Sequence, residues 1–287
     1  MLPLASAFGY AFAALMLKRT MDFGPGPWRI TFFSNWSMAL VALPLLLLPA
    51  GTDGSAAWHL PIWPAITFFG GQIFTFLALF RGDVSVATPL MGTKVLFVAI
   101  LTILILQQPV PLAWWIAAFL STAALALLGG GKSTLKGKLW PTVIYALTSS
   151  LLFAVTDLMT QEWAGAWGVT RFFPAMLGLV AIYSLGFIPF FRESFFVIDR
   201  RAWSWLGFGG LILGIQALGM GIALGLFKNA TAMNIAYSSR GIWSVVLVWA
   251  IGHWFTNEEH LLSRRVLAAR LLGAGMLLIA VALVALA

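Results

Sequence analysis

The sequence alternates long apolar runs with short segments that are rich in polar residues, proline and glycine. A helix of ~20 apolar residues is long enough to cross ~30 Å of hydrocarbon. Membrane-spanning strands would alternate in polarity and would be about half as long, so the pattern predicts helices. We expect ten of them, at roughly 2–17, 30–48, 62–80, 84–106, 112–128, 139–159, 172–190, 203–227, 231–254 and 266–286.

The composition also indicates a protein that lies in a membrane. Of the 287 residues, 61% are hydrophobic and only 9% are charged, which is more apolar surface than a soluble core of this length can bury. We therefore expect an all-α membrane protein whose surroundings are the lipid bilayer. The absence of cysteine and of zinc-ligand spacing among the histidines predicts no metal site and no cofactor. The net charge of +8 lies mostly in loops, and no basic run indicates nucleic-acid binding.

Two of the apolar runs each contain one basic residue near the middle, Lys94 in the fourth run and Arg240 in the ninth. An ionisable group near the centre of a membrane costs roughly 2.5–3.5 kcal/mol on insertion scales. Each cation could serve structure, by pairing with a carboxylate or by capping carbonyl groups between helices. Asp157 is the one carboxylate clearly inside an expected span, so one positive charge is left without an acidic partner.

An anionic solute would relieve this imbalance. At a separation of ~8 Å and an effective dielectric constant of ~20, the two cations would repel by ~2 kcal/mol, and an anion between them would turn that cost into binding energy. Arginine can hold a carboxylate or phosphate with two parallel hydrogen bonds. Ser238, Ser239 and Arg240 would form an anion-binding patch if the helix is locally opened there. The sequence thus predicts that Lys94 and Arg240 contact a small-molecule substrate that carries negative charge.

Other polar residues inside the runs could contact the same substrate or only join neighbouring helices. Gln72 and Gln216 occupy related positions in the two halves of the chain. Trp243 follows Arg240 by three residues and so shares its helix face. Asp157 could couple transport to a proton, or could simply pair with a basic residue. The remaining candidates are Asn35, Tyr237 and Ser239, and with less weight Tyr10, Tyr145, Asn234 and Ser238.

Basic residues are unevenly distributed between the expected loops. Thirteen of the seventeen lysines and arginines fall in the odd-numbered loops and at their borders, whereas the even-numbered loops hold only Arg171 and Lys228. The positive-inside rule places the richer side in the cytoplasm, which puts both termini outside. The expected location is the plasma (inner) membrane of a bacterium, where the protein would be a monomer or a homodimer.

The two halves of the chain show a weak internal similarity. Phe80-Arg81-Gly82 matches Phe227-Lys228-Asn229, each just before a run with a central cation, and residues 28–33 resemble residues 167–173. The offset between matching positions stays between about 139 and 147. Because each half holds five spans, the second half must enter from the opposite side of the membrane. We therefore predict two inverted five-helix repeats, residues 1–131 and residues 132–287.

This organisation resembles the drug/metabolite transporter superfamily, and most nearly its EamA-like family. Residues 25–29, Pro-Gly-Pro-Trp-Arg, are similar to that family's proline, spacer and arginine at the start of the second span. Residues 80–90 are similar to its junction between the third and fourth spans. The resemblance implies transport of amino acids, sugars, nucleotide precursors or drugs. It also implies that both termini face the cytoplasm, whereas the loop charges place them outside.

The leading hypothesis is a secondary transporter, driven by a gradient or by exchange. It would move a small organic metabolite that bears a carboxylate or phosphate, by alternating access around a central cavity. A second hypothesis is an exporter of aromatic or apolar amino acids or of drugs, with Phe32, Trp36 and Trp243 along the path. An intramembrane enzyme is a remote third hypothesis, because the spans offer no nucleophile paired with a base and no paired carboxylates.

Overall fold

The structure is a computed structural model, and it describes all residues except 50–55, 82–83, 130–138, 192–198, 252–263 and 287. Every regular element within the described residues is helical. The elements are α1 (Leu2–Met21), α2 (Pro27–Ala42), η1 (Leu43–Leu47), α3 (Ile62–Phe76), η2 (Leu77–Arg81), α4 (Val84–Met91), α5 (Lys94–Leu106), α6 (Leu112–Gly129), α7 (Leu139–Trp167), α8 (Val169–Tyr183), η3 (Ser184–Phe190), α9 (Arg200–Phe227), α10 (Ala230–Ser238), α11 (Arg240–Ile251) and α12 (Arg264–Leu286).

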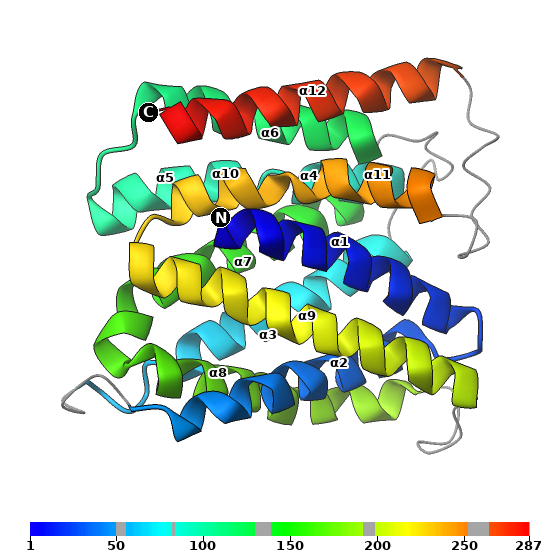
Figure 1. The fold of residues 1–287 in the computed structure, drawn as a ribbon, viewed down its shortest axis with the longest axis vertical. Coiled ribbons are helices and arrows are strands. Elements are labelled where there is room, and N and C mark those ends of the chain that lie inside the picture. The colour runs from blue at the N-terminus through cyan, green and yellow to red at the C-terminus, as the bar shows by residue number, and fades with distance from the viewer. Residues whose placement is uncertain (50–55, 82–83, 130–138, 192–198, 252–263, 287) are drawn as a thin grey trace.

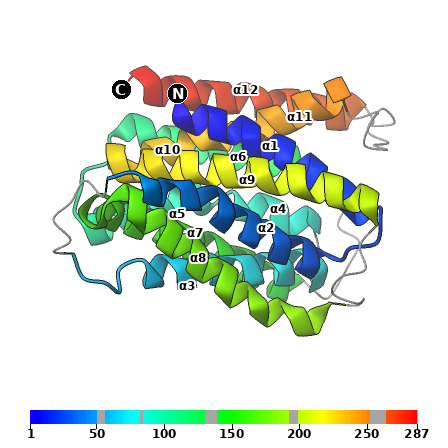
Figure 2. The ribbon, with the colours of Figure 1, turned by 60° about the horizontal axis from the view of Figure 1, so that its bottom comes forward.

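The helices lie side by side in a bundle, with α6 and α12 paired at one edge and α2 and α8 near the opposite edge (Figure 1). Both termini lie at the same end of the bundle in the two ribbon views (Figures 1 and 2). Among the described residues, five helical segments are long and apolar enough to cross a membrane by themselves. They are Pro27–Leu47, Ile62–Leu79, Leu139–Trp167, Val169–Phe190 and Arg200–Phe227.

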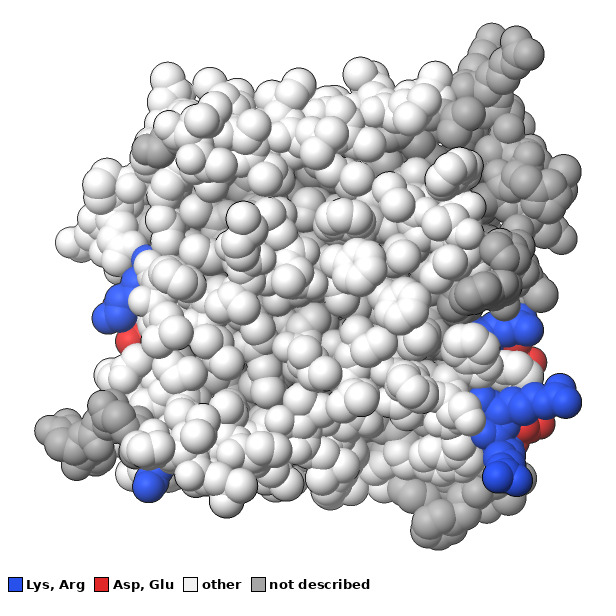
Figure 3. All heavy atoms as spheres, viewed as in Figure 1, with Lys and Arg blue, Asp and Glu red and all other residues white. Residues whose placement is uncertain are grey.

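The outer surface of the bundle is apolar between its two ends. Large hydrophobic side chains such as Leu104, Phe119, Phe208 and Leu271 are each at least 60% exposed, which is the outward-facing composition that lipid requires. On the face drawn in Figure 3, the described charged residues gather at the two ends of the helices and leave the middle free of charge. The expectation of a multi-pass, all-α membrane protein is confirmed at this level.

The two runs that contain a central cation are not continuous helices, contrary to the sequence-based expectation of single spans at 84–106 and 231–254. The first is divided into α4 and α5 at Gly92 and Thr93, and the second into α10 and α11 at Ser239. The other difference in length is α7, which continues to Trp167 instead of ending near residue 159. Apolar helices tolerate such breaks where the freed backbone groups are buried in protein or line a cavity.

The helix contacts follow a pattern that relates the two halves of the chain. Helix α1 packs along α9, and α7 packs along α3; α1 also contacts α11, as α7 contacts α5. Helices α6 and α12 pack against each other, and so do α2 and α8. The contacts of α1 thus correspond to those of α7.

Glycines on α9 allow its close contact with neighbouring helices. A Cβ atom on Gly214 would lie 2.9 Å from Cγ2 of Val41 on α2, and one on Gly221 would lie 2.4 Å from the Phe173 ring on α8. Such distances are shorter than packed carbon atoms allow, so any larger residue would push α9 outward. These glycines on α9 therefore serve close packing against α2 and α8.

Candidate functional site

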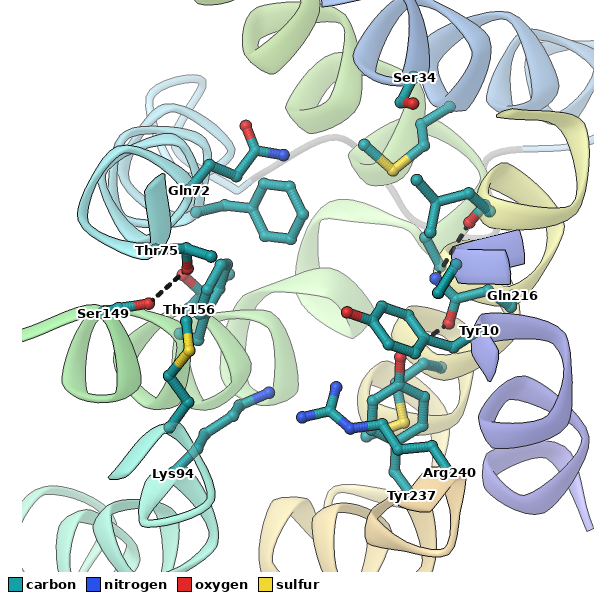
Figure 4. A pocket seen from close by; sticks show the side chains of 18 of the residues that line it. Tyr10, Ser34, Gln72, Thr75, Lys94, Ser149, Thr156, Gln216, Tyr237 and Arg240 are labelled. Atoms are coloured by element: carbon teal, nitrogen blue, oxygen red, sulfur yellow. Dashed lines mark hydrogen bonds between the residues drawn. The ribbon is translucent and has the colours of Figure 1, made fainter. Parts of the chain in front are cut away.

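A cavity of about 740 Å³ lies among the helices of both halves of the chain. It is large enough for a small organic molecule. Its lining combines apolar side chains with a smaller number of polar ones from α1, α2, α3, α5, α7, α9, α10 and α11 (Figure 4). The polar and charged lining residues are Tyr10, Thr31, Ser34, Asn35, Gln72, Thr75, Lys94, Ser149, Ser150, Thr156, Asp157, Thr160, Gln216, Tyr237, Arg240 and Ser244.

The two helix breaks place the two cations in this cavity. Lys94 is the first residue of α5, and Arg240 is the first residue of α11. The N-terminus of a helix carries a partial positive charge from its unpaired N–H groups. A basic side chain at that position adds to the helix dipole instead of offsetting it, so both breaks present positive potential to the cavity. This arrangement is unfavourable alone and favourable beside an anion.

Hydroxyl groups form hydrogen bonds at both helix breaks. At the first break, Ser150 Oγ on α7 donates to the carbonyls of Leu90 and Met91 at 3.3 and 3.2 Å, and Thr122 Oγ1 on α6 donates to Gly92 O at 3.4 Å. At the second break, Ser238 Oγ bonds to Ser121 Oγ of the same helix α6 at 3.1 Å. Adjacent residues of α6, Ser121 and Thr122, thus form hydrogen bonds at the two helix breaks.

Lys94 has an acidic partner. Its Nζ atom lies 2.6 Å from Oδ2 of Asp157 on α7, and the two side chains are 18% and 13% exposed. The same carboxylate oxygen accepts a hydrogen bond of 2.7 Å from Asn234 Nδ2 on α10. Asn234 also donates to Ala230 O at 3.0 Å, so its amide orientation is fixed. The Asp157 carboxylate is therefore held between helices from both halves of the chain.

Arg240 has aromatic neighbours in place of an acidic one. Its Cζ atom lies 4.9 Å from the ring centroid of Tyr10 on α1 and 5.0 Å from that of Tyr237 on α10. Tyr237 Oη donates to Gln216 Oε1 at 3.0 Å, and Gln216 Nε2 donates to Leu213 O at 3.1 Å. Within the described part of the chain, no carboxylate lies within 4 Å of the Arg240 guanidinium.

Lys94 and Arg240 point toward one another from opposite walls of the cavity (Figure 4). The described lining residues include three charged side chains, namely these two cations and Asp157. The Lys94–Asp157 ion pair is neutral as a unit, so Arg240 supplies the one uncompensated charge among them. The cavity therefore offers a net positive centre with a planar set of N–H donors, which suits a carboxylate or phosphate group.

Amide and hydroxyl groups of α2, α3 and α7 also line the cavity. Asn35 on α2 and Gln72 on α3 exchange two hydrogen bonds, from Asn35 Nδ2 to Gln72 Oε1 at 3.0 Å and from Gln72 Nε2 to Asn35 Oδ1 at 2.8 Å. Thr75 and Ser149 hydroxyls lie 2.8 Å apart, joining α3 to α7. These pairs hold helices together and also border the cavity. The helix-joining role is therefore observed, and contact with a substrate stays a prediction.

Of the nine main candidates from the sequence, the structure brings seven to the cavity lining and places two elsewhere. Those in the lining are Lys94, Arg240, Gln72, Gln216, Tyr237, Asn35 and Asp157. Trp243 packs edge-on against Phe8 of α1, with ring centroids 5.3 Å apart, because the same face of α11 also borders α1. Ser239 is 4% exposed and lies at the helix break, and its hydroxyl has no hydrogen-bond partner among the described atoms.

Hydroxyl residues of α7 in the lining were missed by the sequence analysis. Ser149, Thr156 and Thr160 line the cavity together with Phe153 and Asp157. Their spacing of three, four and seven residues places them on one face of a helix. A search for polar residues sharing the helix face of Asp157 would have found them.

Comparison with known proteins agrees with this fold. The model of the EamA-like transporter family matches residues 1–130, which confirms, over this part of the chain, the resemblance noted in the sequence. The match indicates a transporter of the drug/metabolite type. A solved structure titled only as the crystal structure of a protein is similar at a TM-score of 0.72 and 17% sequence identity, covering 98% of each chain. That likeness concerns the fold. No curated protein matches the chain.

Proposed function

We propose that the protein is a secondary transporter of a small organic anion, and that the anion binds in the central cavity beside Arg240. The observation that carries this proposal is the Arg240 side chain, which borders the cavity with no carboxylate of the described residues within 4 Å. Opposite it, Lys94 already has Asp157 at 2.6 Å. A charge that lacks a counter-ion inside a membrane protein is costly, and a substrate that brings a negative charge reduces that cost on binding.

Ten membrane spans, arranged as two inverted five-helix repeats of residues 1–131 and 132–287, are part of the proposal. Counting each pair α4/α5 and α10/α11 as one interrupted span supports this number. The paired contacts of α1 with α9 and of α7 with α3 support the repeat, as does the position of each cation directly after a break. In transporters built from inverted repeats, interrupted helices mark the binding site near the middle of the membrane.

The substrate group is a carboxylate or phosphate. Arg240 suits either one, because its N–H donors form a planar fork. Aromatic side chains of the lining, including Phe68, Phe76, Phe153 and Phe173, favour an aromatic or apolar body on the substrate. This lining also supports the second candidate, an exporter of aromatic or apolar amino acids or of drugs, with the lining phenylalanines taking the place that the sequence gave to Phe32, Trp36 and Trp243.

Buried side chains bound the cavity toward one end of the bundle. Toward the end that holds the termini, the lining consists of buried side chains such as Thr160, Phe173 and Leu224. Beyond them, Gln161 donates to Gln108 Oε1 at 3.3 Å and accepts from Ala230 N at 2.6 Å. This bonded layer joins α7, the α5–α6 connection and α10, and we propose that it is the closed gate of this state.

We propose the plasma membrane of a bacterium as the location, with both termini outside. Lys18 and Arg19 lie in the last turn of α1, and Arg200 begins α9, at the end of the bundle opposite the termini. Several other basic loop residues counted from the sequence, including Lys132, Lys136, Lys138 and Arg192, lie outside the described residues. Coupling of transport to a proton through Asp157 stays a prediction, as does a monomeric or dimeric state.

Transport by the purified protein in liposomes tests the proposal. A panel of radiolabelled organic anions, amines and neutral aromatic compounds would be assayed with the native chain, with Arg240→Gln and with Arg171→Gln, a control at an exposed position outside the cavity. We expect uptake of at least one anion by the native protein and the control, and its loss in Arg240→Gln. Uptake confined to amines, or anion uptake that survives Arg240→Gln unchanged, would disprove the anion site.

A further inference from the structure

We infer that the cavity selects solutes with a single negative charge over those with two, and that Asp157 sets this limit. The inference rests on the proposed function and narrows its substrate class. The described lining contains three charged side chains, and two of them form an ion pair. Lys94 and Arg240 contribute two positive charges and Asp157 one negative charge, which leaves a sum of one positive charge.

The position of Asp157 makes it part of the cavity's charge and not a distant counter-ion. Its Oδ2 atom contacts both Lys94 Nζ at 2.6 Å and Asn234 Nδ2 at 2.7 Å. Lys94 therefore has its nearest anionic site filled, and a solute anion meets Lys94 and Asp157 together as a neutral pair. Only Arg240 remains to be neutralised by a guest.

The environment of Arg240 fixes the side from which an anion approaches. The ring centroids of Tyr10 and Tyr237 lie 6.0 Å apart, and each lies about as near to the guanidinium carbon as the other, at 4.9 and 5.0 Å. Both rings therefore lie on one side of the guanidinium. The opposite side faces Lys94 across the cavity (Figure 4), so an acidic group would approach the guanidinium from that side.

Charge balance in a poorly solvated space decides the selectivity. A monoanion brings the sum of charges in the described lining to zero. A dianion of similar size brings it to minus one, and its second charge also faces the Asp157 carboxylate. A neutral analogue leaves the positive charge of Arg240 unmatched. The interaction energy between charges is several-fold larger in a protein interior than in water. We therefore expect the monoanion to bind at least about tenfold more tightly than the dianion or the neutral analogue.

Changing the charged residues should move the preferred ligand in steps of one charge. Asp157→Asn raises the sum to plus two, so its preferred ligand becomes a dianion. The double variant Lys94→Gln/Asp157→Asn returns the sum to plus one, and the preference returns to monoanions. Arg240→Gln lowers the sum to zero, and the preference for anions over neutral amides disappears. The double variant also removes both members of the ion pair, so it avoids leaving Lys94 unpaired if Asp157→Asn fails to fold.

Ligand-induced thermal stabilisation of the purified proteins in detergent measures these preferences directly, since binding to the folded state raises its stability. Two matched sets of probes keep size similar while charge changes, namely hexanamide, hexanoate and adipate, and benzamide, benzoate and terephthalate. We expect the native chain to be stabilised most by the monocarboxylate of a set, and Asp157→Asn by the dicarboxylate. The double variant should follow the native order.

The outcomes distinguish failure of the charge-selectivity inference from failure of the proposed transport function. Stabilisation of the native chain by dicarboxylates as strongly as by monocarboxylates overturns the charge count and leaves the anion site intact. An Asp157→Asn protein that folds and keeps the native order of ligands overturns it as well. If no monocarboxylate of either set stabilises the native chain, and the panel of transport substrates shows no anion uptake, the proposed function fails together with the inference.

Discussion

The ammonium group of Lys94 lies 2.6 Å from the carboxylate of Asp157. Lys94 begins α5 in the first half of the chain, and Asp157 lies within α7 in the second half. The pair divides the two membrane cations into one that is matched and one that is not. Lys94 contributes to holding α5 against α7, whereas Arg240 keeps its charge facing the cavity, with the rings of Tyr10 and Tyr237 on its other side. The sequence pattern suggests the same two roles for both cations. In the structure Lys94 forms an ion pair between helices, whereas Arg240 is available to a substrate.

Removal of one member of this pair should destabilise the protein more than removal of both. Lys94→Gln leaves Asp157 as an uncompensated charge in a mostly buried position, and breaking such pairs costs roughly 3 kcal/mol or more. The double variant Lys94→Gln/Asp157→Asn replaces the pair with neutral groups of similar size. We expect its melting temperature in detergent to lie above that of Lys94→Gln. Additive losses from the two changes would show that the pair is not coupled.

Two substitutions of Tyr237 can separate the contributions of its ring and its hydroxyl to stability and to anion uptake. Tyr237→Phe removes the hydrogen bond to Gln216, with an expected loss of ~1 kcal/mol in stability, and keeps the ring beside Arg240. Tyr237→Leu also removes the ring, whose interaction with a guanidinium is worth ~0.5–2 kcal/mol. We expect the Phe variant to keep the half-saturation concentration of anion uptake, and the Leu variant to change it. Equal changes in both variants would assign the effect to the hydroxyl.

Two glycines on α9 give a matched test of its packing. A Cβ atom on Gly221 would lie 2.4 Å from the Phe173 ring, whereas one on Gly207 would meet no atom within 4 Å. We expect Gly221→Ala to lower the stability by roughly 1–3 kcal/mol through overpacking. Gly207→Ala should be neutral or stabilising, since alanine favours a helix over glycine. Thermal unfolding of both proteins compares them, and equal melting temperatures would argue against close contact of α9 with α8.

The orientation in the membrane can be tested with single cysteines, because the natural chain contains none. Lys18→Cys introduces a thiol at the end of α1, and Lys228→Cys introduces one at the opposite end of the bundle, after α9. With the termini outside, a membrane-impermeant maleimide added to intact cells should label position 228 and spare position 18. The reverse pattern would place both termini in the cytoplasm and would show that the count of loop charges misleads for this chain.

The positions of the helices and of the two central cations could be read from the sequence, because an apolar run of sufficient length has few alternatives to a membrane helix. The breaks at Gly92 and Ser239 could not. A single small residue in an apolar run is compatible with an unbroken helix, and the hydroxyl groups of α6 and α7 that form hydrogen bonds at the breaks lie far away in the sequence.

The assignment of partners was equally a matter of tertiary structure. Asp157 was the available acid for either cation, and only the packing of α5 against α7 decides that it pairs with Lys94. Trp243 shares a helix face with Arg240, but that face is wide enough for Arg240 to border the cavity while Trp243 contacts Phe8 of α1. Spacing along one helix predicts which residues share a side, and the neighbouring helix decides what they meet.

The most direct test of the account is to locate a bound anion by its own scattering. Crystals of the protein soaked with 4-bromobenzoate would reveal the bromine through its anomalous signal. We expect one site inside the central cavity, with the carboxylate toward Arg240 and the bromine toward the phenylalanine side chains of the lining, and no such site in Arg240→Gln. A bromine position outside the cavity, or an unchanged position in Arg240→Gln, would contradict the claim that Arg240 binds the negative group of the substrate.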